Sequence, residues 1–303
     1  MKKLPTVRQL QYLVALRKTN HFGQAAEACF VSQSAFSTAI KELETTLEVS
    51  LVDRTNRSVV FTLAGINIEQ QAQRCIANID ELSALAKSAS EPFSGALRIG
   101  LIPTVAPYIL PNLLPALRTS YPNLELYLKE GQSQQIYQQL ISGELDLILF
   151  AQPYDAPHTT IHPLFKDPFH FAFSKQSEHS GQKVVDFTEL DTDSLLLLED
   201  GHCLRDHALA ACNLKDQVQL SQFSANSLYT LVQMVNSNLG VTLLPDMAID
   251  YLNLDKTDIS TCELKSNFYR TISLAWREGS SRQSEYLSIA NTIESAVIKS
   301  HPS

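Results

Sequence analysis

Two cysteines spaced nine residues apart are the side chains of this sequence best suited to covalent chemistry. Cys203 and Cys212 lie in the stretch LEDGHCLRDHALAAC. Gly201 predicts a turn, and residues 204–211 are mostly strong helix formers, so Cys203 is expected at the amino-terminal end of a helix. The positive potential at that end favours the thiolate, which is the form of cysteine that attacks a peroxide.

The charged neighbours of Cys203 act in opposite directions. His202 and Arg205 would stabilise a thiolate, whereas Asp206 and the two acids before Gly201 favour the neutral thiol unless they are paired. The direction in which the pKa of Cys203 is shifted therefore stays a hypothesis at this point.

The spacing of the two cysteines has a geometric consequence. Nine helical residues would separate Cys203 from Cys212 by about 13.5 Å, and a disulfide needs α-carbons within about 7 Å. If the pair bonds, the helix must unwind or shift, and oxidation becomes a conformational switch. Two alternatives stay open: the cysteines are ordinary helix residues, or His202, Cys203, His207 and Cys212 bind zinc, although this spacing fits no common zinc pattern.

The amino-terminal segment predicts a DNA-reading fold. Thr6 can cap a first helix, a second covers residues 24–29, and Ser32 can cap a third over residues 33–47. Helix, tight turn and helix is the layout of a helix-turn-helix, and a plain three-helix bundle is the alternative. The residues expected to face the major groove are polar: Gln33, Ser34, Ser37, Thr38 and Lys41. Arg54 and Arg57 flank a polar turn before a short strand that could reach phosphates.

Charge supports a nucleic-acid partner for this segment. Residues 1–62 contain eight Lys or Arg and five Asp or Glu, a net charge of +3, within a chain whose net charge is −8. A basic block on an acidic protein is typical of an anion-seeking module, although charge alone also fits ordinary surface scatter.

Residues 63–90 predict a long helix between two domains. Its apolar positions alternate in steps of four and three residues: Ile68, Ala72, Cys75, Ile79, Leu82 and Ala86. A single stripe of this period is buried best by a second copy of the helix, which predicts a dimer; packing on the chain's own carboxy-terminal part is the alternative. Cys75 in this stripe and Cys29 in the second helix are interpreted as buried filler, and Cys262 as incidental.

From residue 96 the pattern changes to alternating strands and helices, which predicts a parallel sheet covered on both faces. A second α/β unit is expected from about residue 165, and a strand at 271–275 with a helix at 284–299 is expected to return to the first. The fold class is therefore α+β overall, with a helical winged helix-turn-helix (1–62), a linker helix (63–90) and a two-lobed α/β domain (91–303). Lobe I covers about 95–164 and 268–303, and lobe II about 165–267.

Several protein classes are disfavoured by the sequence. No apolar stretch fits a secretory signal or a membrane span, and five scattered cysteines fit a reducing cytosol, so a cytoplasmic location is expected. A glycine-rich phosphate loop, a zinc-protease motif and a nucleophile elbow are all missing. We therefore expect a protein that is not an enzyme and that uses no cofactor and no metal.

Two stretches resemble a known family. AAEACFVSQSAFSTAIKELETTLEVSLVDRTNRSVVFTLAG is similar to the winged helix-turn-helix of LysR-type regulators. Ser34, Thr38-Ala39 and Glu48 depart from that pattern, which leaves the operator sequence open. LLLLEDGHCLRDHALAAC resembles the redox segment of the peroxide-sensing OxyR branch, and the likeness extends to residues 101–108 and 240–245. The carboxy-terminal domain would then resemble periplasmic binding proteins.

The resemblance implies roles for individual residues. Cys203 would be oxidised by hydrogen peroxide and Cys212 would resolve it to a disulfide. The residues implied around the peroxide are Thr104, Ser133, His202, Asp206 and Arg270. Ser133, His207 and Ala211 depart from the usual Thr, Gln and aromatic residue, which leaves the rate and balance of switching open.

The resemblance also implies partners. The protein would bind a roughly palindromic double-stranded operator as a homodimer or homotetramer, and would activate oxidative-stress genes with RNA polymerase. Two rival functions remain: a LysR-type regulator that answers a small metabolite between the lobes, and a thiol peroxidase.

Overall fold

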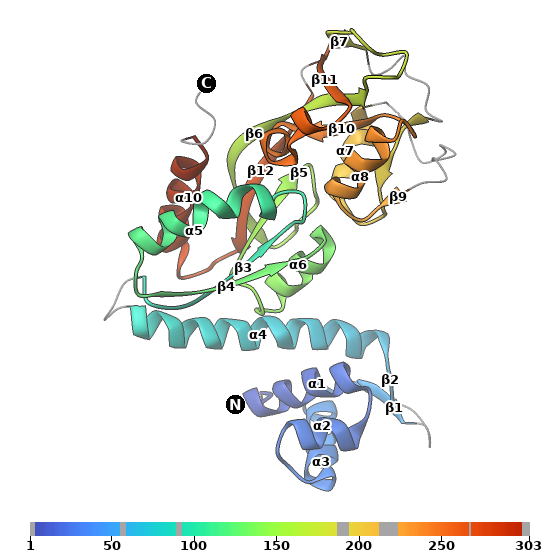
Figure 1. The fold of residues 1–303 in the computed structure, drawn as a ribbon. Helices are drawn as coiled ribbons and strands as arrows, with labels where there is room; N and C mark the ends of the chain where they lie inside the picture. Colours follow the sequence, from blue (N-terminus) through green and yellow to red (C-terminus); the bar gives the residue numbers. More distant parts are fainter. Residues whose placement is uncertain are drawn as a thin grey trace. The chain divides into compact units, whose positions relative to one another are not determined.

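The computed structural model describes residues 4–54, 59–88, 93–186, 194–211, 224–266 and 268–298. The chain forms two compact units, of which the first contains residues 1–90 with 141–144 and the second contains the rest. In the described parts we find no helix with the length and apolar character that a membrane span requires. The predicted mixed fold, a helical amino-terminal domain and an α/β domain, is confirmed (Figure 1).

The first unit is a helix-turn-helix with a two-stranded wing and a long helix. Its elements are α1 (Val7–Thr19), α2 (Phe22–Ala28), α3 (Gln33–Leu47), β1 (Val52–Arg54), β2 (Val59–Phe61) and α4 (Leu63–Ser88). The predicted caps are confirmed, because the Thr6 hydroxyl accepts a hydrogen bond from the Gln9 amide and the Ser32 hydroxyl accepts one from the Ala35 amide.

Close packing fixes the orientation of α3. Ala25 and Ala26 are buried, and the Tyr12 and Phe36 rings stack with centroids 4.8 Å apart. Gly65, in the first turn of α4, has its α-carbon directly against the Leu51 backbone, so any β-carbon there would clash. The recognition helix and the wing are therefore held on one rigid core.

The apolar stripe of α4 is only partly covered within this unit. Ala72 is buried against the helix-turn-helix core, whereas the side chains of Ile79 and Leu82 are exposed. Cys75 and Cys29 are half-buried, so their interpretation as buried filler is corrected: neither lies fully inside the core.

The second unit is built on one large mixed sheet. Its first elements are β3 (Gly95–Leu101), α5 (Ala106–Ser120), β4 (Leu124–Glu130), α6 (Ser133–Ile141), β5 (Leu147–Gln152), β6 (Thr159–Ser174) and β7 (Val184–Val185). The others are β8 (Leu197–Leu198), α7 (Cys203–Ala211), β9 (Ser224–Ala225), α8 (Leu228–Asn236), β10 (Thr242–Pro245), α9 (Asp246–Ile249), two 3₁₀ turns (Asp250–Leu252 and Leu254–Lys256), β11 (Ile259–Leu264), β12 (Tyr269–Arg277) and α10 (Gln283–Ile298).

The strand order corrects the prediction of a parallel sheet. The order is β4-β3-β5-β12-β6-β11-β7, with β10 also paired to β6. Strands β3, β4 and β5 are parallel, because helices α5 and α6 connect them, but β12 pairs antiparallel with both β5 and β6. Strand β6 is long enough to belong to both lobes, so the lobes share a continuous strand.

Two apolar cores lie along this shared strand, one against its first half and the other against its second half. One surrounds β3, β5, β12, α5, α6 and α10, and the other surrounds β10, β11, α7 and α8. In Figure 1, α7 and α8 lie together beside the part of the sheet formed by β10. The two cores meet close to the amino terminus of α7, where Cys203 lies.

Candidate functional site

Cys203 is the first residue of α7, as predicted, and its thiol is free and buried. Its side chain packs in the core of the first lobe, whereas the next apolar residues of α7, Leu204 and Ala208, pack in the core of the second. The amino terminus of α7 therefore joins both lobes, and a change at Cys203 would act on both cores.

The turn before α7 holds this helix end in place. Gly201 has φ of +92°, and the Gln132 side chain lies so close that a β-carbon there would displace it. The Gln132 amide donates a hydrogen bond of 3.3 Å to the Asp200 carbonyl. Asp200 also forms an ion pair with Arg205, so Arg205 faces the turn before α7.

Arg270 is the cation of the site, and it is fully buried. Its Nε donates to Asp167 Oδ2 at 2.9 Å, its Nη1 to Thr104 Oγ1 at 2.8 Å, and its Nη2 to the Thr104 carbonyl at 2.9 Å. Nη2 also contacts Met247 Sδ at 3.5 Å. A buried guanidinium with a paired carboxylate and fixed acceptors cannot swing away from the site.

Counting the hydrogen-bond donors of Arg270 and Thr104 shows which of them remain available. A guanidinium has five N–H groups, and these contacts use four of them, which leaves one Nη1 hydrogen for a further oxygen. Because Thr104 Oγ1 accepts from Arg270, its own hydroxyl hydrogen remains available to donate. The arrangement therefore presents donors to an incoming oxygen.

Ser133 completes the arrangement from α6. Its Oγ is buried and has no well-formed hydrogen-bond partner among the described residues. It nevertheless lies near enough to the Cys203 thiol to lower the pKa of that thiol. A buried hydroxyl without a satisfied bond beside a thiol is suited to a small polar molecule.

Opposing influences act on the pKa of Cys203. The outcome is a pKa above that of a free thiol, because burial is the largest influence; Arg270, the Ser133 hydroxyl and the Leu204 amide lower the pKa, and Asp206 raises it. The predicted cations are therefore corrected: burial lowers the pKa of His202 and so favours its neutral form, and Arg205 is paired with Asp200. Arg270, distant in sequence, supplies the charge instead.

The other residues predicted around the site take different positions. His202 is buried beside Cys203, whereas Asp206 is exposed in the first turn of α7. His207 is buried, its Nε2 lies 3.2 Å from the Pro153 carbonyl, and its Nδ1 has no partner among the described residues. Burial lowers the pKa of His207 to about 4.

Sequence reasoning missed two residues of the cluster. Asp167 is buried between Arg270 and the backbone amide of Met247, which donates to its Oδ1 at 3.0 Å. The available signal was weak: Asp167 lies just before the largely apolar end of β6, where a buried acid requires a partner. The Met247 contact has no sequence signal.

The predicted DNA-facing residues lie along one helix. Gln33, Ser34, Thr38 and Lys41 are exposed on α3, and Ser37 is half-buried. Three of the predicted positions cannot be placed: Arg57 and Cys212 lie outside the described residues, and only the backbone of Arg54, the last residue of β1, is described.

In the described parts no three His, Cys, Asp or Glu side chains are grouped as metal ligands would be; Cys212, the fourth residue of the zinc alternative, lies outside those parts.

Comparison with known families agrees with this architecture. Residues 7–66 match the bacterial regulatory helix-turn-helix protein, lysR family, and residues 90–293 match the LysR substrate binding domain.

Curated relatives include two regulators of equal identity. EstR of Acinetobacter baylyi, an HTH-type transcriptional regulator, is 39% identical over 94% of this chain and 95% of its own length. OxyR of Escherichia coli, a DNA-binding transcriptional dual regulator, is 39% identical over 95% of this chain and 94% of its own length.

Solved structures give the same result. A cysteine variant of full-length OxyR from Pseudomonas aeruginosa superposes with a TM-score of 0.76 at 32% identity, covering 96% of this chain and 95% of that one. A hydrogen-peroxide-bound cysteine variant of OxyR from Corynebacterium glutamicum gives a TM-score of 0.67 at 31% identity, covering 99% and 94%. With both domains matched over nearly its whole length, the chain belongs to the LysR family of DNA-binding transcriptional regulators.

Proposed function

We propose that this LysR-family regulator senses hydrogen peroxide through Cys203 and transmits oxidation to DNA by forming a disulfide with Cys212. One observation carries the proposal: a buried thiol at a helix amino terminus lies against an unsatisfied hydroxyl, Ser133, and near a fixed guanidinium, Arg270. The likeness to OxyR proteins supports it, whereas EstR, equally identical, shows that family membership alone does not select the signal.

The first chemical step is oxidation of the thiol. The Cys203 thiolate attacks one oxygen of hydrogen peroxide, the O–O bond breaks, and the sulfur becomes a sulfenic acid while hydroxide leaves and takes a proton to form water. Thr104 and Ser133 have hydroxyls that both donate and accept, as peroxide requires. The remaining Nη1 hydrogen of Arg270 stabilises the charge on the leaving oxygen.

The second step links chemistry to shape. The Cys212 thiol displaces water from the sulfenic acid and forms the disulfide. From Cys203 to Ala211, α7 rises about 12 Å, and one further residue reaches back at most about 3.8 Å. The α-carbons therefore stay about 8 Å or more apart, beyond the roughly 7 Å of a disulfide, until α7 changes. Because α7 joins both lobe cores, its change would rearrange the whole domain.

The DNA-binding half of the proposal rests on α3. Ser32 caps this helix, and α2 packs against it. The exposed polar face of α3 would read the major groove. The exposed Ile79 and Leu82 of α4 support a dimer on a roughly palindromic operator, with a tetramer and contact to RNA polymerase as further parts of the proposal.

Disulfide mapping tests the redox half. The reduced full-length protein is treated with stoichiometric hydrogen peroxide, free thiols are blocked, and peptides are identified by mass spectrometry. We expect a rapid Cys203–Cys212 crosslink that is absent beforehand. Free thiols in a protein that still binds DNA would overturn peroxide sensing in favour of a metabolite between the lobes. Turnover of many equivalents of peroxide with a thiol reductant, and no effect on DNA binding, would favour a thiol peroxidase.

A lysine comparison tests the DNA half. Lys41→Ala should weaken binding to operator fragments selected from random DNA and reduce the salt dependence by about one phosphate contact. Lys18→Ala, on α1, is the matched control. If Lys41→Ala and Lys18→Ala bound the operator with equal affinity, Lys41 would not contact DNA and the predicted DNA-facing side of α3 would be wrong.

A further inference from the structure

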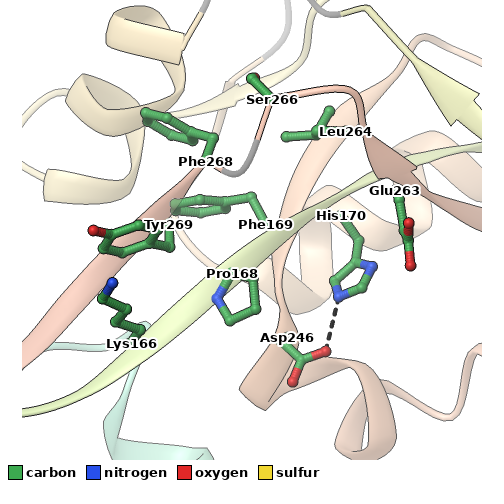
Figure 2. A pocket seen from close by; sticks show the side chains of 10 residues that line it. All are labelled: Lys166, Pro168, Phe169, His170, Asp246, Glu263, Leu264, Ser266, Phe268 and Tyr269. Atoms are coloured by element: carbon green, nitrogen blue, oxygen red, sulfur yellow. Dashed lines mark hydrogen bonds and ion pairs between the residues drawn. The ribbon is translucent and has the colours of Figure 1, made fainter.

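A cavity outside the Cys203 site lies in the second unit, where β6, β11, β12 and the start of α9 meet. Its volume is 460 Å³, within the range of small-molecule sites. Figure 2 shows its lining, with Lys166 from β6 on one side and Glu263 from β11 on the other. None of the residues proposed to react with peroxide lines this cavity.

One end of the cavity is cationic. Lys166 is exposed, and its Nζ lies 4.2 Å from the centroid of the Tyr269 ring. A cation placed on an aromatic face keeps its hydrogen-bond donors for a ligand anion. This end is therefore suited to a carboxylate.

The opposite end is acidic. His170 Nε2 lies 2.8 Å from Asp246 Oδ1, and the Asp246 side chain is 44% exposed. Glu263 is the direct partner of His170 in the β11–β6 ladder, and its side chain is also exposed. The two carboxylates outnumber the one histidine, so this end has an excess of negative charge, which is suited to an ammonium group.

The floor between the two ends is apolar. Pro168, Phe169, Leu264 and Phe268 line it, and the rings of Phe169 and Phe268 stack with centroids 5.3 Å apart. A ligand for this cavity must therefore have an apolar body between an anionic and a cationic end.

The length of β6 sets the size of that ligand. Lys166 and His170 point to the same side of the strand, and four residues of extended chain separate their α-carbons by about 13 Å. This span of the cavity exceeds the length of one amino acid and has room for two extended residues, about 7 Å long, with a hydrogen bond of about 3 Å at each end. We propose that the cavity is a second ligand site that binds a dipeptide with apolar side chains by its two charged termini.

The cavity adjoins the Arg270 cluster. The guanidinium carbon of Arg270 lies 5.9 Å from the centroid of the Phe169 ring, which lines the cavity. Asp246 also precedes Met247, whose amide donates to Asp167. Because these contacts are buried and closely packed, a ligand that shifts Phe169 or Asp246 changes the surroundings of Arg270, and the reactivity of Cys203 with it.

Calorimetric titration of the reduced full-length protein with the dipeptide Leu-Phe tests the site. We expect saturable binding with a Kd below about 1 mM, weakened about tenfold when the amino terminus is acetylated or the carboxylate is amidated. Lys166→Met should weaken binding of Leu-Phe and remove the discrimination against the amide. Lys175→Met, at an exposed lysine outside the cavity, is the matched control and should bind as the wild type does.

Two results would overturn the site: no saturable heat up to about 10 mM peptide, or equal affinity for the free and capped peptides. A second readout tests the link to Arg270 without peroxide. Saturating Leu-Phe should change the alkylation rate of Cys203 by about twofold or more, with Cys29 as the internal reference. An unchanged Cys203 rate with bound peptide would overturn the link. Neither the calorimetric titration nor the alkylation rate depends on peroxide sensing. A failure of the proposed peroxide response would therefore leave both tests of the ligand site valid.

Discussion

Cys203 and Cys262 are both buried thiols of the same unit, and burial raises the pKa of each. They differ in the groups that face them. A carboxylate raises the pKa of each thiol further, Asp206 for Cys203 and Glu263 for Cys262, but at Cys203 alone Arg270, the Ser133 hydroxyl and the Leu204 amide lower the pKa. Burial alone makes a thiol inert, and a buried thiol becomes chemically useful only where the fold supplies a cation and donors.

Secondary structure accounts for part of this difference. Cys262 lies inside β11, opposite Phe171, where ladder hydrogen bonds occupy the neighbouring amides. Cys203 begins α7, where the first amides of a helix have no partner within that helix. A cysteine side chain therefore lies near free backbone donors at position 203 and near amides that are already hydrogen-bonded at position 262.

The largest expected effect comes from exchanging each thiol. Cys203→Ser should abolish the peroxide-induced change in operator binding, because serine cannot form the sulfenic acid. Cys262→Ser, the matched control at the other buried thiol, should retain it. Gel-shift titration with and without peroxide measures the response of both variants. If only Cys262→Ser lost the response, Cys262 and not Cys203 would be the reactive thiol.

Removing the cation should make Cys203 resemble Cys262. Arg270→Met should slow alkylation of Cys203 at neutral pH by about 100-fold through a higher thiol pKa, and should destabilise the protein by about 3–5 kcal/mol because Asp167 stays buried without its partner. Rates of alkylation against pH, with chemical denaturation, check both. Arg270→Lys keeps the charge and should recover part of the reactivity; no recovery would assign the effect to packing.

A pH measurement sharpens the contrast within α7. Burial lowers the pKa of His207 to about 4, against 6.5 for a free histidine, so unfolding binds a proton between these values. Stability should therefore fall as pH drops from about 6.5 to about 4, by up to about 3 kcal/mol. His207→Gln should lack this loss in pH-dependent unfolding. His158→Asn, at an exposed histidine, should behave as the wild type, and parallel curves for all three proteins would contradict the prediction.

The smallest expected effect concerns the hydroxyl beside the thiol. Ser133→Ala should slow oxidation of Cys203 by about tenfold, because one donor to the reacting oxygens is lost. Ser133→Thr keeps the hydroxyl and should remain near the wild-type rate in stopped-flow peroxide assays. If alanine and threonine were equally slow, the space at this position rather than its hydroxyl would matter.

Local patterns predicted much of the fold. The caps Thr6 and Ser32, the helix that starts at Cys203 and the exposed polar face of α3 follow from signals within a few residues, and all are confirmed. The antiparallel β12 was not predictable from strand-helix alternation, because its pairing depends on a return of the chain across the whole domain.

The sequence by itself determined which helix begins with a cysteine, where the recognition helix lies, and that a second cysteine follows nine residues later. The family resemblance placed Arg270 near the peroxide, but only the tertiary structure decided that Arg270 acts on the thiol while His202 and Arg205 do not, and that Asp167 holds it in place. The physical reason is the distance along the chain over which each interaction acts. Helix signals come from neighbours in sequence, whereas desolvation and Coulomb interactions depend on which distant strands pack around a group.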